Sequence, residues 1–287
     1  MSDIISISND CISAQISTLG AELKSVKLGE KEILWEGDPA VWSGQAPLLF
    51  PICSGLKDDK FIFEGKEYNL TKHGFAKFSE FEIESNDSSS ATFLLRSNSE
   101  TLKCYPFEYE LRVTYTLENN VIRVDYKVAN IGNTNMYYSI GAHEGYACPE
   151  GIEKYSIVFE KTEDIMSNKI DGHLLSYEKT MIAENCKELP LKQEYFNIDA
   201  IIMTDIKSQK AAIRNLETGK IVVEVDFNGF ENLLIWTKPN APYVCIEPWC
   251  GITDYVDSDY DIIKKPCIIE VLPGEESLRC HSITLFD

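Results

Sequence analysis

The stretch YELRVTYTL, residues 109–117, has an apolar residue at every odd position and a polar residue at every even position. Side chains alternate between the two faces of a β-strand, so this pattern predicts a strand with one buried face. Asn119 and Asn120 follow, and asparagine tolerates the positive φ that tight hairpins need. Apolar residues then return at every second position from 122 to 128. The sequence therefore predicts a β-hairpin at this point.

The same period of two recurs on both sides of this hairpin. It predicts further strands over residues 61–63, 67–68, 79–84, 91–96, 211–214, 221–227 and 233–237. A short helix is expected only over 257–265, and the less regular residues 161–198 are expected to form an excursion with loops. Many short strands separated by turns are typical of an all-β sandwich or barrel. No linker divides the chain, so one domain over residues 1–287 is expected.

Charge and composition restrict the partners. The 287 residues include 27 Lys and Arg against 46 Asp and Glu, which gives a net charge of -19. Such an acidic chain repels polyanions, so we expect neither nucleic acid nor an anionic membrane surface as a partner. The start of the chain has no basic and apolar leader pattern, and no stretch approaches the ~20 apolar residues of a membrane span. We expect a cytoplasmic protein with reduced thiols.

Several familiar enzyme motifs do not occur in the sequence. There is no GxGxxG, GxxxxGK[ST], GxSxG or HExxH, so dinucleotide, P-loop, α/β-hydrolase and zincin chemistry is not supported. The nine cysteines include no CxxC pair. Cys245 and Cys250 are half of a metal site at most, and small buried apolar residues are the commoner interpretation. We expect no metal and no cofactor.

Two histidines and two carboxylates stand out in what remains. His73 and His143 lie close to glycines, which let a backbone approach a ligand, and imidazole titrates near neutral pH. Glu247 interrupts an apolar strand, where an isolated charge is costly, and Asp199 lies at the edge of another apolar run. Trp249 is suited equally to a sugar face or to the core. Taken singly, each of these residues also fits a structural role.

Together these segments resemble the aldose 1-epimerase (galactose mutarotase) family, and the resemblance covers nearly the whole chain. It is closest to a branch of uncharacterised bacterial epimerase-like proteins. The matching segments are GAELKS (20–25), LWEGDP (34–39) with Trp42, APLLFPI (46–52), HGFA (73–76), GAH (141–143), DA (199–200) and EPW (247–249). The resemblance implies a large antiparallel β-sandwich, the galactose mutarotase-like supersandwich, with few short helices and a sugar cleft on one concave sheet.

The family resemblance also implies roles for individual residues. Glu247 matches the general base that takes the proton from the O1 hydroxyl, and His143 matches the general acid that protonates ring oxygen O5. His73 matches a second histidine near the ring oxygen. Asp199 matches a carboxylate that binds sugar hydroxyls. The apolar platform that sugars require falls to Phe75 or Trp249.

Several positions depart from the family pattern, among them Glu144 and Gly145 directly after His143. Gly55 stands where members of this branch usually carry an arginine. Lys77, which is expected to contact the sugar, stands where an arginine often follows HGFA. Lysine lacks the two-pronged grip of arginine on oxygens, which disfavours a hexose 6-phosphate substrate. His173 and His281 have no supporting context and are expected to be surface or structural residues.

The leading hypothesis is an aldose 1-epimerase that acts on a free hexose as a monomer or homodimer. The alternatives are a weakly catalytic or non-catalytic carbohydrate-binding protein on the same fold, a hexose-6-phosphate 1-epimerase, and another carbohydrate enzyme. A glycosidase needs two carboxylates about 5–9.5 Å apart, for which Asp199 and Glu247 are candidates.

Overall fold

The computed structural model describes residues 2–197 and 199–287. Its largest sheet is built from β7 (Glu82–Asn86), β8 (Ser90–Arg96), β9 (Tyr109–Glu118), β10 (Val121–Asn130), β14 (Tyr155–Asp171), β15 (Leu174–Pro190), β17 (Lys210–Asn215), β18 (Ile221–Asp226) and β22 (Glu276–Leu285). These described strands are antiparallel in the order β15-β14-β17-β18-β22-β10-β9-β8-β7. The predicted hairpin is confirmed at its centre, because β9 and β10 pair from Glu118 and Val121 outward and Asn119 has a φ of 54°.

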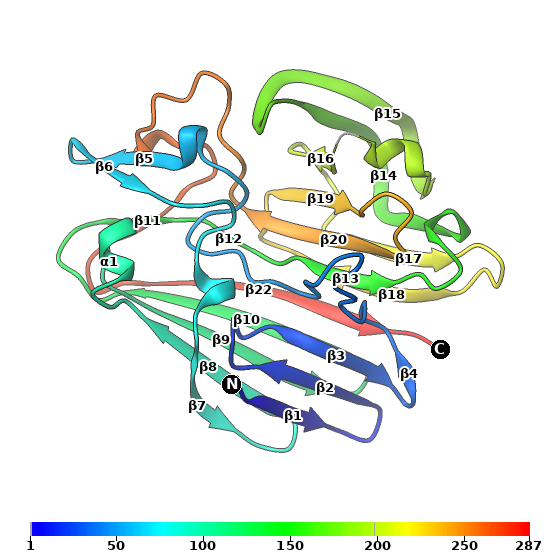
Figure 1. The fold of residues 1–287 in the computed structure, drawn as a ribbon. Coiled ribbons are helices and arrows are strands. Elements are labelled where there is room, and N and C mark those ends of the chain that lie inside the picture. Colours follow the sequence, from blue (N-terminus) through cyan, green and yellow to red (C-terminus); the bar gives the residue numbers. More distant parts are fainter. Residues whose placement is uncertain (1, 198) are drawn as a thin grey trace.

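Two smaller sheets form the second layer. One contains β1 (Ile4–Ser8), β2 (Ile12–Ser17), β3 (Leu23–Leu28) and β4 (Lys31–Glu32). The other contains β12 (Ile140–Gly141), β13 (Glu144–Ala147), β16 (Ile201–Met203), β19 (Asn232–Trp236) and β20 (Tyr243–Cys250). Figure 1 shows the first of these sheets in blue near β7–β10, and β19 and β20 in orange on the side of β14 and β15.

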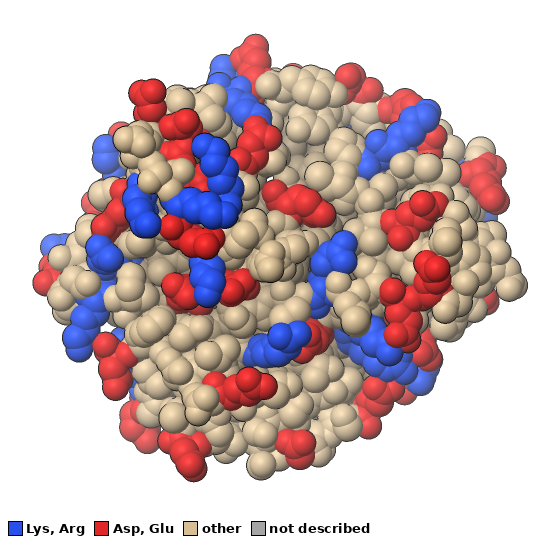
Figure 2. All heavy atoms as spheres, turned by 180° about the vertical axis from the view of Figure 1, so that it is seen from behind, with Lys and Arg blue, Asp and Glu red and all other residues tan. Residues whose placement is uncertain are grey.

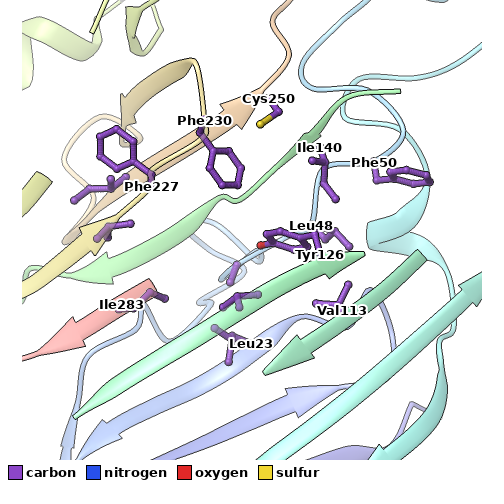
Figure 3. Close-up of a cluster of buried hydrophobic side chains, with 14 of the residues drawn as sticks. Leu23, Leu48, Phe50, Val113, Tyr126, Ile140, Phe227, Phe230, Cys250 and Ile283 are labelled. Atoms are coloured by element: carbon purple, nitrogen blue, oxygen red, sulfur yellow. The ribbon is translucent and has the colours of Figure 1, made fainter. Parts of the chain in front are cut away.

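The core lies between these layers. Leu23 of β3, Val113 of β9, Tyr126 of β10 and Ile140 of β12 are all buried in one hydrophobic cluster (Figure 3). One face of the large sheet is therefore covered by both smaller sheets, which explains why its central strands alternate apolar and polar residues so strictly. The predicted large antiparallel β-sandwich is confirmed.

The remaining described elements are short. They are β5 (Lys60–Phe63), β6 (Lys66–Asn69), β11 (Met136–Tyr138), β21 (Ile269–Val271), the helix α1 (Thr101–Cys104) and single 3-10 turns at Lys57–Asp59, Ala76–Phe78, Ile152–Lys154, Gln193–Phe196 and Ile262–Lys264. The helix predicted over 257–265 is wrong apart from that last turn. Tyr260 has a φ of 68°, in the left-handed region, and its carbonyl accepts a hydrogen bond from the Ile62 N–H, so no right-handed helix runs through this residue. No described helix has the length and apolar character of a membrane span.

The prediction of an irregular excursion over 161–198 is also wrong for most of its length. β14 and β15 form a hairpin of two 17-residue strands with repeated register shifts. Each shift moves the buried residues out of phase with the strand period, and most of β15 lies at the surface. A strand of that kind carries no alternating pattern. Ile198, the last residue of the predicted excursion, lies outside the described residues.

Acidic and basic side chains are mixed on the surface. Figure 2 shows Lys and Arg interspersed among Asp and Glu on the back of the molecule. Charges of both signs therefore occur across that face.

Candidate active site

A cleft of about 950 Å³ opens beside β19 and β20. Its walls also include the loops at 54–59 and 72–77, residues 196–197 and 199–200, and the tip of the β14–β15 hairpin. Six of the seven residues proposed for the site line this cleft: His73, Lys77, His143, Asp199, Glu247 and Trp249. Residues from distant parts of the sequence therefore meet in one place.

Glu247 lies at the base of the cleft on β20. This strand is held on both sides, because Leu234 of β19 is paired with Glu247 and Glu144 of β13 is paired with Ile246. The Glu247 side chain is only 2% exposed, and its Oε2 lies 3.4 Å from Nε2 of His143. A buried carboxylate thus contacts a buried imidazole at the floor of the cleft.

Burial shifts both groups of this pair toward their neutral forms. The pKa of Glu247 is raised well above its ordinary value, chiefly by desolvation and further by the charge of Asp199, while Lys72 opposes the rise. Desolvation lowers the pKa of His143 to about 3, and Lys72 and Lys77 add to that effect. Since the two groups are in contact, they titrate as a pair. Burial therefore favours a protonated Glu247 beside a neutral His143.

The backbone fixes the tautomer of His73. The Ser54 N–H donates a hydrogen bond of 3.0 Å to Nδ1 of His73. Desolvation, followed by the influence of His143, lowers the pKa of His73 well below its usual range, so its neutral ring carries the proton on Nε2. The turn that presents this ring requires Gly74, because a Cβ there would lie 2.3 Å from the Phe50 carbonyl oxygen at a φ of +67°. His73 is thus a fixed donor in the cleft wall.

Asp199 and Lys77 occupy the rim. The carboxylate of Asp199 is half-buried and accepts a hydrogen bond of 2.9 Å from the Ala200 N–H. Lys77 is also half-buried, and its Nζ donates to the Lys72 carbonyl over 3.2 Å. Each side chain keeps further hydrogen-bonding capacity for a ligand.

The aromatic walls differ from those expected. Phe75 packs against Phe50 and Tyr105 and is not among the described residues that line the cleft. Trp249 does line it, although it is only 3% exposed. Two half-buried tryptophans not proposed for the site also line the cleft. Their ring centroids lie 5.3 Å (Trp42) and 5.4 Å (Trp236) from that of His143.

These missed residues carried only weak signals in the sequence. Trp42 belongs to one of the segments that resemble the family, and Trp236 ends an apolar strand. Lys72 precedes His73 directly and influences both members of the buried pair. The tip of the β14–β15 hairpin had no signal, because the hairpin itself was not predicted.

Neither the possible metal ligands nor the two remaining histidines point to a further function. Donor atoms of His143, Cys245 and Glu247 lie within 4.8 Å of one another, a set of the kind that zinc takes. Burial raises the pKa of the Cys245 thiol well above its usual value, which works against the thiolate that a metal needs. His281 is buried, with Nε2 3.1 Å from Glu144 Oε1, and His173 is exposed at the hairpin tip.

Comparisons with known proteins agree with this fold. The LacX proteins of Lactococcus lactis subsp. lactis, plasmid and chromosomal, are each 35% identical over 298 aligned residues, covering 99% of this chain and 99% of the relative. A galactose mutarotase related enzyme from Lactobacillus acidophilus superposes with a TM-score of 0.94 at 33% identity, with 99% of this chain and 98% of that chain covered. A galactose mutarotase-like protein from Lactobacillus casei gives 0.92 at 27% identity, with 99% and 100% covered.

Fold and cleft thus define a carbohydrate epimerase of the galactose mutarotase-like class. The model of one family, aldose 1-epimerase, matches residues 3–278. The chain belongs to the aldose 1-epimerase family.

Proposed function

We propose that the protein interconverts the α and β anomers of a free hexose. The contact of 3.4 Å between His143 Nε2 and Glu247 Oε2 at the base of the cleft carries this proposal. Opening a sugar ring requires one proton to leave the O1 hydroxyl and one to reach ring oxygen O5. Rotation about the C1–C2 bond and closure on the other face then give the opposite anomer. An adjacent carboxylate and imidazole perform both transfers together.

Glu247 takes the O1 proton and His143 delivers a proton to O5. The reactive form is the carboxylate beside the imidazolium, whereas burial favours the proton on Glu247 beside a neutral His143. These two forms hold the same number of protons, so their ratio does not change with pH. Ring opening leaves the pair in the form that burial favours, and ring closure reverses both transfers.

The surrounding residues bind and orient the sugar. His73 donates from Nε2 near the ring oxygen, since its Nδ1 is occupied by the Ser54 N–H. Asp199 accepts hydrogen bonds from sugar hydroxyls, and Lys77 donates to them. Trp249 and the more exposed ring of Trp236 supply the apolar wall. The cleft therefore combines a few polar groups with apolar surface, as sugar sites require.

A carbohydrate-binding protein is the second candidate. It is favoured by Gly55, which leaves the cleft wall without the side chain that similar proteins of this branch usually have. It is also favoured by the burial that holds the pair in its unreactive form. A binding protein requires the cleft and its hydrogen-bonding groups, whereas only an epimerase requires the proton pair.

Polarimetry separates the two functions. Freshly dissolved α-D-glucose, α-D-galactose and glucose 6-phosphate are followed with and without protein, with Glu247→Gln as the control. We expect a faster approach to the same final rotation for at least one free hexose, and loss of that acceleration in the variant. Sugar binding without acceleration would replace the proposal with the binding protein. Acceleration restricted to glucose 6-phosphate would replace the free hexose with the phosphate.

A further inference from the structure

Asp254 and Lys265 form an ion pair that is buried behind the wall of the cleft. Their side chains are only 4% and 3% exposed, respectively. Taking two charges out of water is costly, and apolar side chains of similar shape are often at least as stable in such a position. The stability of the fold is therefore a weak reason for this pair, and its contacts with neighbouring loops indicate another role.

Asp254 holds a loop of the cleft through both its side chain and its backbone. Its Oδ2 accepts a hydrogen bond from the Lys57 N–H over 3.0 Å, and its own N–H donates to the Gly55 carbonyl over 3.2 Å. Oγ1 of the neighbouring Thr253 accepts from the Gly55 N–H, also over 3.2 Å. Lys265 binds the other carboxylate oxygen, Oδ1. Three hydrogen bonds thus fasten this loop to the segment that carries the ion pair.

The fastened loop presents the backbone of Ser54 to His73. The Ser54 N–H donates to Nδ1 of His73 over 3.0 Å, and the His73 N–H donates to the Ser54 carbonyl over 2.8 Å. Both residues have a positive φ, 58° for Ser54 and 69° for His73, which is strained for a residue with a Cβ. Strained backbone persists only where its surroundings hold it in place. The contact between these two residues therefore depends on how the loop after Ser54 is anchored.

We propose that Asp254, held by Lys265, is a positioning residue for His73. Asp254 is not among the described residues that line the cleft. It holds the loop so that the Ser54 N–H stays on Nδ1 and the proton of the neutral ring stays on Nε2. Without this anchor the ring also carries its proton on Nδ1, and Nε2 then has no hydrogen to donate toward the ring oxygen of the sugar. The expected effect on rate rests on the proposed anomer exchange, whereas the tautomer of His73 is a property of the free protein.

Two double variants test the anchor, because both remove the two charges and they differ in one hydrogen-bond acceptor. The polar double variant, Asp254→Asn with Lys265→Gln, keeps an oxygen for the Lys57 N–H. The apolar double variant, Asp254→Leu with Lys265→Met, fills the same space without that oxygen. Nitrogen NMR of isotope-labelled histidine reports the tautomers. The chain has only four histidines, so the His73→Gln spectrum identifies the signals of His73.

Both double variants should remain folded, since neutral side chains replace a buried ion pair at little cost. We expect the polar double variant to keep the proton of His73 on Nε2 and to retain the activity of the wild type. In the apolar double variant the ratio of the Nδ1–H form to the Nε2–H form should rise by roughly two- to tenfold, as for the loss of one neutral hydrogen bond. Its kcat/KM in polarimetry should fall by about tenfold or more, because the donor is also displaced.

An unchanged His73 tautomer in a folded apolar double variant would overturn the positioning role, since the ion pair would then serve the fold alone. If that variant fails to fold, Lys57→Pro replaces it. Proline removes the N–H that Asp254 accepts, and the preceding Leu56 is already extended, as a residue before proline must be.

Lys57→Ala is the control for this proline variant, because it loses the side chain and keeps the N–H. The tautomer of His73 should change in Lys57→Pro and not in Lys57→Ala, and identical spectra for the two variants would overturn the proposal. If the wild type accelerates no sugar, anomer exchange fails on its own, and the tautomer of His73 still decides the positioning role.

Discussion

Replacing Glu247 by glutamine removes one charge from the reaction centre and little of its shape. At an effective dielectric constant of 20, unit charges separated by the 3.4 Å between Oε2 and His143 Nε2 attract by about 5 kcal/mol. The amide no longer accepts the O1 proton, and it no longer stabilises the imidazolium. General acid–base catalysis contributes about 10²–10⁴-fold, so we expect kcat/KM to fall by that factor.

The same substitution should stabilise the fold, and the sign follows from the raised pKa of Glu247. A group whose pKa is higher in the folded state than in the unfolded state contributes stability at low pH and loses it as pH rises. The wild type is therefore destabilised as pH rises above the ordinary carboxyl pKa of 4.5, because a buried carboxyl must remain protonated or become a buried charge. Glutamine carries no such penalty. The stability gain of Glu247→Gln should be absent near pH 4 and grow toward neutral pH.

Polarimetry on fresh α-D-glucose and thermal unfolding at several pH values measure the two effects. His143→Gln and the double variant provide the control, because groups that act as a unit give strongly non-additive losses. A Glu247→Gln variant that keeps kcat/KM within tenfold of wild type would show that Glu247 is not the base. A fall in activity together with a fall in melting temperature at neutral pH would instead mean that the carboxylate supports the fold.

Three further perturbations test the surroundings of the site. Lys72→Met removes a positive charge that lowers the pKa values of His143 and Glu247. Both limbs of the pH–rate profile should therefore move to higher pH. Limbs that stay in place or move apart would contradict this. Gly74→Ala places a Cβ 2.3 Å from a backbone oxygen, whereas Gly65→Ala meets nothing within 4 Å at a similar positive φ. Left-handed strain should lower the free energy of unfolding of both variants by ~1–2 kcal/mol, and the clash should lower that of Gly74→Ala clearly further. Equal losses for the two variants in denaturant unfolding would rule out the clash. His281→Ala leaves the Glu144 carboxylate buried without its partner 3.1 Å away. The free energy of unfolding should fall by about 3–5 kcal/mol, while the folded enzyme remains active. An unchanged melting temperature would show that the pair is not structural.

Sequence periodicity predicts the strands of this fold only where one face of a strand is buried and the other is exposed. β9 meets that condition along its whole length and β10 until its last three residues, which are all buried, so the stretch at 109–128 predicts both strands closely. β14 and β15 do not, because register shifts change the face of their side chains and β15 lies largely at the surface. The missing pattern therefore has a physical cause in the hairpin itself.

The candidate site could be predicted residue by residue only through the family resemblance. Glu247 was marked by physics alone, since a carboxylate within an apolar strand needs a partner. Its contact with His143 depends on how β13 and β20 pair, which no local pattern contains. Trp236 was missed because an aromatic residue at a strand end has the same sequence signal in a core as in a cleft wall.

Gly55 shows how a sequence departure acquires meaning from structure. In the sequence it is a missing arginine, which suggests a weaker site. In the structure the backbone at this point needs no glycine, yet its neighbours are fixed through Thr253 and Asp254. The fold therefore does not require glycine here, so the missing side chain changes the wall of the cleft and not the course of the backbone.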